Sequence, residues 1–254
     1  MVKVKDNETI VLIDEKERKY ILNTSQKTDK YKGVGVVDPK IFVGREYGSQ
    51  FDLGNKKFWV LKPSLMDKIQ SLKRRAQIIL PKDAAQIIIN CSIKPGSKVL
   101  EAGIGSGALT VSLASMIAPN GKIISYDNRE EFIDHAFKNI KTAELDSLVE
   151  TKLKDVTEGI DEKNLDAIIL DMPNPWDAVK HAFKSLKPGG YLCCYSPLST
   201  QVQKNVEEIK KYNFIEIKTF ENIQREIVVS ENGMRPSFNM LGHTGYLTFA
   251  RKTK

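Results

Sequence analysis

The sequence contains only three cysteines in 254 residues, Cys91, Cys193 and Cys194. Their odd number and the lack of a Cys-x-x-Cys spacing argue against a disulfide framework and a structural zinc site, so we expect reduced, packed thiols and no bound metal. No run approaches the roughly 18 apolar residues that a membrane span needs, and the first residues lack the apolar centre of a signal peptide. We therefore expect a cytoplasmic protein that does not associate with membranes.

The amino-acid composition is that of a folded chain rather than a disordered one, because 41% of the residues are hydrophobic and 28% are charged. The formal net charge is +7, with +3 in residues 1–61, +5 in 62–95, −4 in 96–198 and +3 in 199–254. A basic surface attracts polyanions such as nucleic acid without specifying a sequence. A lysine-rich solubilising surface would give the same pattern, so the charge alone leaves both interpretations open.

The hydrophobic pattern changes twice along the chain and divides it into three regions. Residues 1–61 hold short β-branched and aromatic runs separated by Gly, Asn and Asp, which predict a small β domain. Residues 62–95 follow a helical period that Pro81 divides into two helices, and we interpret them as a helical linker. Residues 96–254 alternate apolar strands with amphipathic helices, which predicts an α/β fold with an open, mostly parallel, doubly wound sheet.

The third region ends in strands without a long helix between them, so we expect an antiparallel element at one edge of its sheet. The expected parallel strands are 98–102, 122–127, 149–153, 167–171 and 191–195; the expected helices lie near 107–117, 130–141, 176–186 and 200–211; and the expected edge strands are 214–220, 225–229 and 245–250.

The clearest motif is a glycine-rich turn between a strand and a helix, formed by Gly103, Gly105, Ser106 and Gly107 and followed by Leu109. Glycines let the backbone approach a ligand closely, and the free N–H groups of a helix N-terminus attract a carboxylate or phosphate. The turn therefore predicts a nucleotide-like cofactor. Because it also fits the dinucleotide pattern G-x-G-x-x-G/A, the turn alone leaves NAD and S-adenosylmethionine open.

Three acidic residues near strand ends refine the cofactor prediction. Glu101 lies two residues before Gly103, where negative charge favours a cationic sulfonium ligand with an α-amino group over a pyrophosphate. Asp127 ends the second strand and can accept hydrogen bonds from ribose hydroxyls, or else cap the following helix. Asp155 follows the third strand and can accept from an adenine amino group, although an ordinary loop acid fits equally well. Glu101 thus favours the methyl donor.

Asp171 ends the fourth strand and precedes a loop, residues 172–176, that two prolines stiffen. Ligands of open α/β sheets bind at the carboxyl ends of the strands, so Asp171 is the candidate catalytic residue, with a helix cap as the alternative. Ser196 and Pro197 follow the fifth strand in the same way and either line the same crevice or form an ordinary turn.

With these motifs in this order, the chain resembles the tRNA (adenine-N1)-methyltransferase family that modifies the T-loop adenine at tRNA position 58. Many methyltransferases share the glycine turn, whereas the Asp-x-Pro-x-Pro-Trp and Gly-His-Thr segments are much more particular to this family. The resemblance spans residues 64–254 and rests on segments 74–83, 101–110, 170–176, 234–236 and 242–247.

The resemblance implies a doubly wound, seven-stranded Rossmann-like methyltransferase core over residues 96–254 with a small N-terminal β domain, usually assembled as a homotetramer. It implies that Asp171 contacts the target base and that the stretch from Gln77 to Pro81 lies beside S-adenosylmethionine. Leu80 departs from the family pattern, because many relatives have Tyr there, and Asp127 stands where relatives often have Glu. The expected cofactor-binding residues are Glu101, Gly103, Gly105, Ser106, Gly107, Leu109, Asp127, Asp155, Gln77 and Leu80.

A tRNA substrate would need basic residues, and Lys73, Arg74 and Arg75 form a candidate phosphate-binding strip, although a solvated helix face fits as well. Arg235 is a further candidate, toward RNA or toward a neighbouring subunit. We interpret His243 as structural or at an interface. Three other functions stay open: a methyltransferase of the same fold that acts on a small molecule or a protein carboxyl, a non-catalytic tRNA-binding subunit, and an NAD-dependent oxidoreductase.

Overall fold

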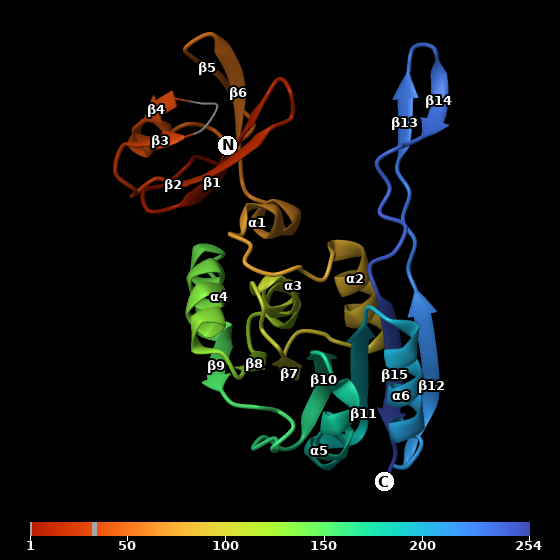
Figure 1. The fold of residues 1–254 in the computed structure, drawn as a ribbon. Coiled ribbons are helices and arrows are strands. Elements are labelled where there is room, and N and C mark those ends of the chain that lie inside the picture. Colours follow the sequence, from red (N-terminus) through yellow and green to blue (C-terminus); the bar gives the residue numbers. More distant parts are fainter. Residues whose placement is uncertain (1, 32–34) are drawn as a thin grey trace. The chain divides into compact units, whose positions relative to one another are not determined.

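The computed structural model describes residues 2–31 and 35–254 of the chain (Figure 1). The chain divides into two compact units, Met1–Leu72 and Lys73–Lys254. The helical stretch expected over 62–95 is thereby shared between the units, since its first helix belongs to one and its second helix to the other. None of the helices in the described ranges is both long and apolar enough to cross a membrane.

The first unit is a small antiparallel β structure, which confirms the predicted N-terminal β region. Its four-stranded sheet has the order β2-β1-β6-β5, and a separate two-stranded ladder joins β3 to β4. The inward side chains Ile10, Leu12, Phe42, Phe58 and Val60 form its buried core. The elements are β1 (Thr9–Asp14), β2 (Lys19–Asn23), β3 (Asp29–Tyr31), β4 (Gly35–Val37), η1 (Pro39–Phe42), β5 (Gln50–Leu53), β6 (Lys56–Leu61) and α1 (Leu65–Ser71).

The second unit is built on a seven-stranded sheet of order β12-β15-β11-β10-β7-β8-β9, which confirms the predicted α/β class and doubly wound core. The five strands from β11 to β9 run parallel, and β15 pairs antiparallel with both β11 and β12. Chain order reverses at β7, between β10 and β8, which is where ligands of such sheets bind. The strands are β7 (Lys98–Ala102), β8 (Lys122–Asp127), β9 (Val149–Leu153), β10 (Leu165–Asp171), β11 (Leu186–Ser196), β12 (Phe214–Glu221) and β15 (Tyr246–Lys252).

Helices cover both faces of this sheet: α2, α3 and α4 lie on one face, and α5 and α6 on the other (Figure 1). Helix α3, which follows the glycine turn, is apolar and almost wholly buried, as a helix packed between neighbours and a sheet must be. Pro81 is the first residue of α2, where its missing N–H costs no hydrogen bond. The helices are α2 (Pro81–Asn90), α3 (Ala108–Ile117), α4 (Glu130–Thr142), η2 (Asp146–Leu148), η3 (Pro175–Ala178), α5 (Val179–Ser185) and α6 (Ser199–Ile209).

The predicted strands 98–102, 122–127 and 149–153 have the bounds of β7, β8 and β9, whereas β10 and β11 begin earlier than predicted. The helix expected near 176–186 is a short 3-10 turn, η3, that leads into α5. Cys91, Cys193 and Cys194 are free and buried, which confirms the expected packed thiols.

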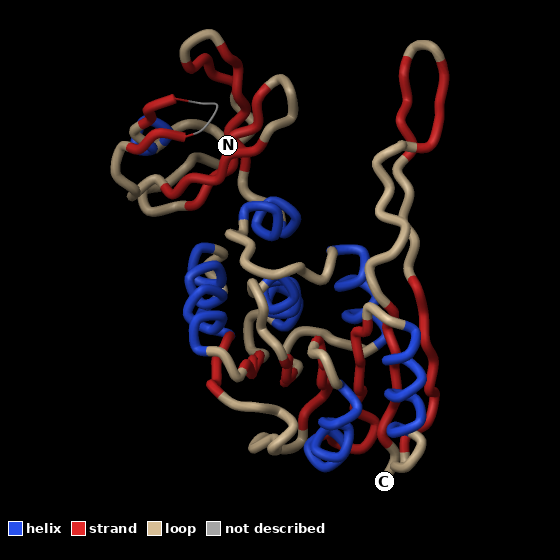
Figure 2. The backbone as a smooth tube through the Cα atoms, in the orientation of Figure 1, coloured by secondary structure: helices blue, strands red, loops and turns tan. Residues whose placement is uncertain are grey.

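The predicted edge strand 225–229 is not part of the main sheet. Its residues lie in β13 (Ile227–Ser230), which pairs only with β14 (Gly233–Pro236) in a separate hairpin. The reason is topological: β15 returns directly alongside β12, so the 24 residues between them loop out. Figure 2 shows the irregular segments that lead to and from this hairpin. We call residues 222–245 the hairpin arm; its exposed apolar side chains include Ile227, Val229, Met234 and Phe238.

Candidate active site

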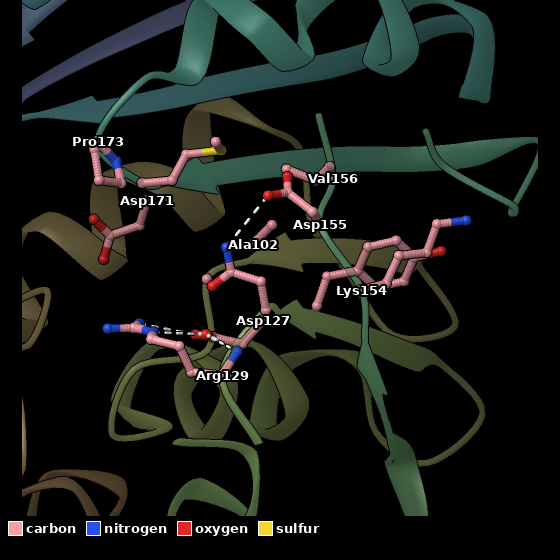
Figure 3. Close-up of a pocket in the computed structure, with 12 residues that line it drawn as sticks. Ala102, Asp127, Arg129, Lys154, Asp155, Val156, Asp171 and Pro173 are labelled. Atoms are coloured by element: carbon pink, nitrogen blue, oxygen red, sulfur yellow. Dashed lines mark hydrogen bonds and ion pairs between the residues drawn. The ribbon is translucent and has the colours of Figure 1, made fainter. Parts of the chain in front are cut away.

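A cavity of about 290 Å³ opens at the carboxyl ends of β7, β8 and β10, where the chain order of the sheet reverses. Its volume is at the lower end of what small-molecule sites usually have. Figure 3 shows the side chains of Asp127, Asp155 and Asp171 around it. The lining residues are Ala102, Gly103, Tyr126, Asp127, Asn128, Arg129, Lys154, Asp155, Val156, Asp171, Met172 and Pro173.

The glycine turn after β7 forms one wall of the cavity. The Gly103 N–H donates to the Asp171 carbonyl at 2.9 Å, which joins the turn to the end of β10. A Cβ on Gly103 would stand 2.8 Å from Asp127 Oδ2, so a larger residue there would displace that carboxylate. Gly105 and Gly107 have φ of +54° and +80°, which side chains disfavour, and Gly107 caps the N-terminus of α3.

Asp127, the last residue of β8, is paired with Arg129. Its Oδ1 accepts from the backbone N–H of Arg129 at 3.1 Å and from Nε at 3.0 Å, and its Oδ2 accepts from Nη2 at 3.2 Å (Figure 3). The Asp127 side chain is only 2% exposed, whereas that of Arg129 is 50% exposed. The hydrogen bonds that the Arg129 side chain donates to Asp127 are the largest cause of a raised Arg129 pKa. The pair neutralises the carboxylate at the cavity wall.

Asp155, in the loop after β9, is held by its neighbours in a similar way. Its Oδ1 accepts from the Thr157 N–H at 2.8 Å and the Thr157 hydroxyl at 2.6 Å. Its Oδ2 accepts from Asn128 Nδ2 at 3.2 Å, the contact marked at Asp155 in Figure 3. The hydrogen bonds from Thr157 lower the pKa of Asp155, because they stabilise its ionised form. Asn128 thus connects the loop after β8 to the loop after β9.

Asp171, the last residue of β10, differs from both. Its carboxylate has no hydrogen bond or ion pair to any residue of the described ranges, and burial raises its pKa to about 7. The loop that follows is fixed from α6, because Gln201 Nε2 donates to the Pro173 carbonyl at 2.9 Å. Gln201 Oε1 also accepts from the Leu198 N–H at 2.9 Å, which ties the loops after β10 and β11 together. With a pKa of about 7, the Asp171 carboxyl can change its protonation near neutral pH.

Glu101 lies in β7 beneath the cavity and does not line it. One carboxyl oxygen, Oε2, accepts from the hydroxyls of Thr110 at 2.6 Å and Ser125 at 2.9 Å. Burial raises the pKa of Glu101 to about 8, and the nearby charges of Asp171 and Asp127 act in the same direction, against the lowering effect of the two hydroxyls. This raised pKa favours the uncharged form of Glu101 at neutral pH, whereas the sequence led us to expect a negative charge at this position.

Ser106 connects the glycine turn to the segment that carries Lys73, Arg74 and Arg75. Its hydroxyl accepts from the N–H groups of Arg75 at 3.0 Å and Ala76 at 3.2 Å. Asn139 of α4 completes the connection, since its Nδ2 donates to the carbonyls of both Lys73 and Ser106 and its Oδ1 accepts from the Lys73 N–H. The three basic side chains stay exposed while their backbone is fixed.

Comparison with known proteins connects this geometry to a family. The model of the family described as "tRNA methyltransferase complex GCD14 subunit" matches residues 58–235. This chain belongs to the GCD14 family. It is 39% identical, over 95% of its own length and 94% of the relative, to the tRNA (adenine(57)-N(1)/adenine(58)-N(1))-methyltransferase TrmI of Methanocaldococcus jannaschii.

Two solved structures resemble this GCD14 family member over nearly the whole chain. A SAM-dependent O-methyltransferase from Thermotoga maritima has a TM-score of 0.88 at 32% identity, covering 99% of this chain and 95% of the other. The tRNA (m1A58) methyltransferase TrmI of Aquifex aeolicus has a TM-score of 0.82 at 28% identity, covering 100% of both chains. The methyltransferase fold implied by the sequence is thereby confirmed.

The structure of this family member brings four of the predicted site residues to the cavity wall: Gly103, Asp127, Asp155 and Asp171. The other predicted cofactor residues do not line the cavity, and Arg235 lies on β14 with its guanidinium 4.1 Å from the centre of the Phe238 ring. Gln77 is exposed, Leu80 is partly buried before α2, and Leu109 is buried in α3. Not on the wall are Glu101, Gly105, Ser106, Gly107, Leu109, Gln77 and Leu80.

Sequence reasoning missed the residues that engage these acids, above all Asn128 and Arg129. Their signal was present, because a basic residue two positions after a strand-ending acid can fold back onto it. It also missed a buried network at the base of the hairpin arm, in which Lys82 Nζ donates to Asp83 and to the Thr244 hydroxyl at 2.7 Å, and Thr244 donates to Asp83 at 2.8 Å. His243 contacts Glu221 and the Pro197 carbonyl in the same region. No group of three or more potential metal ligands occurs among the residues that the structure describes.

Proposed function

We propose that this protein transfers a methyl group from S-adenosylmethionine to N1 of adenine in the tRNA T loop. The observation that carries the proposal is the near full-length similarity to a tRNA adenine-N1-methyltransferase, together with the acid Asp171 at the cavity, whose carboxylate has no partner among the described residues. The relative is named for positions 57 and 58. Adenine in this part of the tRNA is accordingly the proposed target.

The residues around the cavity fit S-adenosylmethionine, which supplies an electrophilic methyl group when it is bound. The close packing of Gly103 against Asp127 leaves backbone, rather than a side chain, at the wall. We propose that the glycine turn, Asp127 and Asp155 hold the cofactor, because carboxylates accept hydrogen bonds from hydroxyl and amino groups. We further propose that cofactor binding is supported by Gly105, Gly107, Leu109, Gln77 and Leu80. The carboxyl of Glu101 contributes a polar group to the same region.

We propose that Asp171 is the catalytic residue and that it orients the target base. Adenine N1 carries its lone pair in the ring plane, so it needs alignment more than deprotonation. As N1 gains a methyl group, the base becomes positively charged and its N6–H group becomes more acidic. A carboxylate that accepts from N6–H then interacts more strongly with the transition state than with the neutral base. Asp171 is suited to this role because no other group among the described residues engages its carboxylate.

A base in a folded tRNA must leave its stack to reach such a cavity, at a cost of a few kcal/mol. We propose that the exposed strip of Lys73, Arg74 and Arg75 helps to offset this cost by binding phosphates, with Arg235 as a further contact. The expected result of changing all three strip residues to Gln is a tRNA affinity that depends less steeply on salt, by about 0.7 to 0.9 in log–log slope for each phosphate that the protein no longer neutralises. An unchanged slope in a binding titration would assign the strip to an ordinary solvated surface.

We propose that the protein self-associates, as a homotetramer, and that it works in the cytoplasm. The support for self-association is the hairpin arm, whose two strands are exposed along their whole length and carry Ile227, Val229 and Met234 on the surface. A two-stranded hairpin is marginally stable by itself in water, and exposed apolar patches usually mark interaction surfaces. Sedimentation of the protein at several concentrations tests this.

The deciding experiment is to incubate the protein with labelled S-adenosylmethionine and unmodified tRNA and to map the modified nucleotide. Label on N1 of a T-loop adenine is the expected result. The Thermotoga maritima structure is described as that of an O-methyltransferase, so small-molecule and protein acceptors should be tested in parallel. Label in a metabolite or in protein would select that class instead, and label nowhere would favour a non-catalytic subunit or an oxidoreductase.

A further inference from the structure

The acceptor atoms of Asp127 are almost fully used within the protein. An ionised carboxylate offers about four lone-pair positions, two on each oxygen. Arg129 takes three of them: its backbone N–H and Nε both donate to Oδ1, and its Nη2 donates to Oδ2. The proposed partner, a ribose diol, donates two hydrogen bonds. At least one bond from the Arg129 side chain therefore has to break before the diol can be held by both of its hydroxyls.

The surroundings of the Arg129 side chain allow it to move away from Asp127. Asp127 is buried, and a buried carboxylate needs a hydrogen-bond donor or a cation as its partner, which Arg129 supplies. The guanidinium itself is half exposed and lines the cavity, so water can replace the carboxylate as its partner. It also lies 3.7 Å from the centre of the Phe132 ring, and this contact to an aromatic face does not depend on Asp127.

We infer that Arg129 is a competitor for the cofactor site: its side chain satisfies Asp127 in the free protein and gives up the carboxylate when the ribose of the cofactor binds. This inference rests on the proposed function. Arg129 then helps to set the affinity for the cofactor without contacting the cofactor as a ligand. Removing the arginine side chain should tighten cofactor binding, because the backbone N–H of residue 129 stays while its two side-chain bonds disappear.

The other unit supplies a matched control. Asp14 is also buried and is also paired with an arginine close in sequence, since its oxygens accept from the Arg18 backbone N–H and from its guanidinium. This pairing lowers the pKa of Asp14 to about 2, against the opposing effect of burial. Neither residue lines the cavity. Arg18→Ala therefore breaks the same kind of pair without touching the proposed cofactor site.

The test measures S-adenosylhomocysteine binding by titration calorimetry with wild type, Arg129→Ala, Arg129→Lys and Arg18→Ala. We expect Arg129→Ala to bind about two- to fivefold more tightly, the range that follows from losing a partly exposed ion pair as competitor. Arg129→Lys should lie between, because a lysine cannot make the bidentate contact. Arg18→Ala should equal wild type. The gain should shrink for a 2′-deoxy analogue, which needs only one acceptor.

A second readout guards against misfolding. Without ligand, the unfolding midpoint of Arg129→Ala should be lower than that of wild type, and saturating S-adenosylhomocysteine should raise it by more than it raises the wild-type midpoint. Weaker or unchanged affinity in a folded Arg129→Ala protein would overturn the inference alone and would make Arg129 a ligand or a bystander. Failure of wild type to bind the nucleoside would overturn the proposed cofactor, and the inference with it.

Discussion

The two sides of the cavity hold their acids in opposite ways. On the side of β8 and β9, Asp127 and Asp155 are each engaged by residues of the adjoining loops, Arg129 for one and Asn128 and Thr157 for the other. On the side of β10, Asp171 has no such partner within the described residues, and its pKa is raised to about 7 by burial, whereas that of Asp155 is lowered.

This difference suggests a way in which one edge of a sheet combines ligand binding with chemistry. Carboxylates that are already hydrogen-bonded stay ionised and can exchange one donor for another when a ligand arrives, so they suit a binding role. A carboxyl that lacks donors in a low-dielectric setting gains more from a new donor, especially one that becomes more acidic during the reaction. We therefore propose that the side of Asp127 serves binding and the side of Asp171 serves turnover.

The largest expected effect separates the two sides directly. Asp171→Asn should lower turnover by about 10²–10³-fold while leaving S-adenosylhomocysteine affinity within about twofold, because an amide of the same shape cannot replace a charged acceptor in the transition state. Asp127→Asn should do the reverse, weakening cofactor affinity by about tenfold with turnover at saturation largely kept. Single-turnover methylation and calorimetry on the same preparations measure both quantities.

The pH dependence of turnover provides a control for the comparison of Asp171→Asn with Asp127→Asn. Asp171 is a negatively charged acceptor only when it is ionised, and this charge is what should stabilise the developing positive charge of the base, so wild-type turnover should rise as the pH passes through about 7 and then level off. This step should be missing in Asp171→Asn. Equal losses of turnover and affinity in both variants would contradict the division of labour, as would a pH step that survives in Asp171→Asn.

Glu101 provides the next effect, on stability rather than on rate. The folded protein holds its proton up to about pH 8, whereas the unfolded chain releases it near the ordinary pKa of 4.5. The folded state thus binds more protons between these values, so the free energy of unfolding should fall as the pH rises through this window. Glu101→Gln removes this dependence and should raise the unfolding midpoint relative to wild type by a few degrees near pH 9, but not near pH 5.

Comparing Glu101→Gln with wild type isolates the effect of Glu101 on stability. Asp171 is present in both proteins, and its raised pKa changes the free energy of unfolding in the same direction in each. Thermal unfolding followed by circular dichroism at the two pH values is sufficient. If the two curves stay parallel over the whole range, burial does not keep Glu101 protonated, and the raised pKa of Glu101 would have to be abandoned.

The strand-end acids could be predicted from the sequence because parallel strands share one carboxyl edge. Asp127, Asp155 and Asp171 each stand at or just after the end of an apolar run, and that pattern alone brings them to one crevice. What they bond to could not be predicted in this way. The contact of Arg129 with Asp127 depends on how a turn directs one long side chain, and periodicity carries no information about that.

Long-range polar contacts and the hairpin arm could not be predicted from the sequence, for a related reason. Asp83 and Thr244 are 161 positions apart and meet only because α2 packs near the start of β15. Residues of the predicted strand 225–229 do form a strand, but an alternating pattern does not determine which strand it pairs with. In the structure it pairs with β14 rather than with the edge of the main sheet. Local pattern predicted the elements, and tertiary packing decided their neighbours.

The smallest expected effect tests whether the basic strip belongs to the binding side. Ser106→Ala removes the hydroxyl that accepts from the N–H groups of Arg75 and Ala76, and each of these hydrogen bonds is worth about 1 kcal/mol. We expect tRNA affinity to weaken by roughly fivefold, because the strip loses its fixed backbone, with cofactor affinity nearly unchanged. Ser112→Ala is the matched control, since its buried hydroxyl donates only within α3, to the Ala108 carbonyl. A loss confined to cofactor affinity in Ser106→Ala would show instead that Ser106 serves the glycine turn alone, and the strip would then have no structural connection to the site.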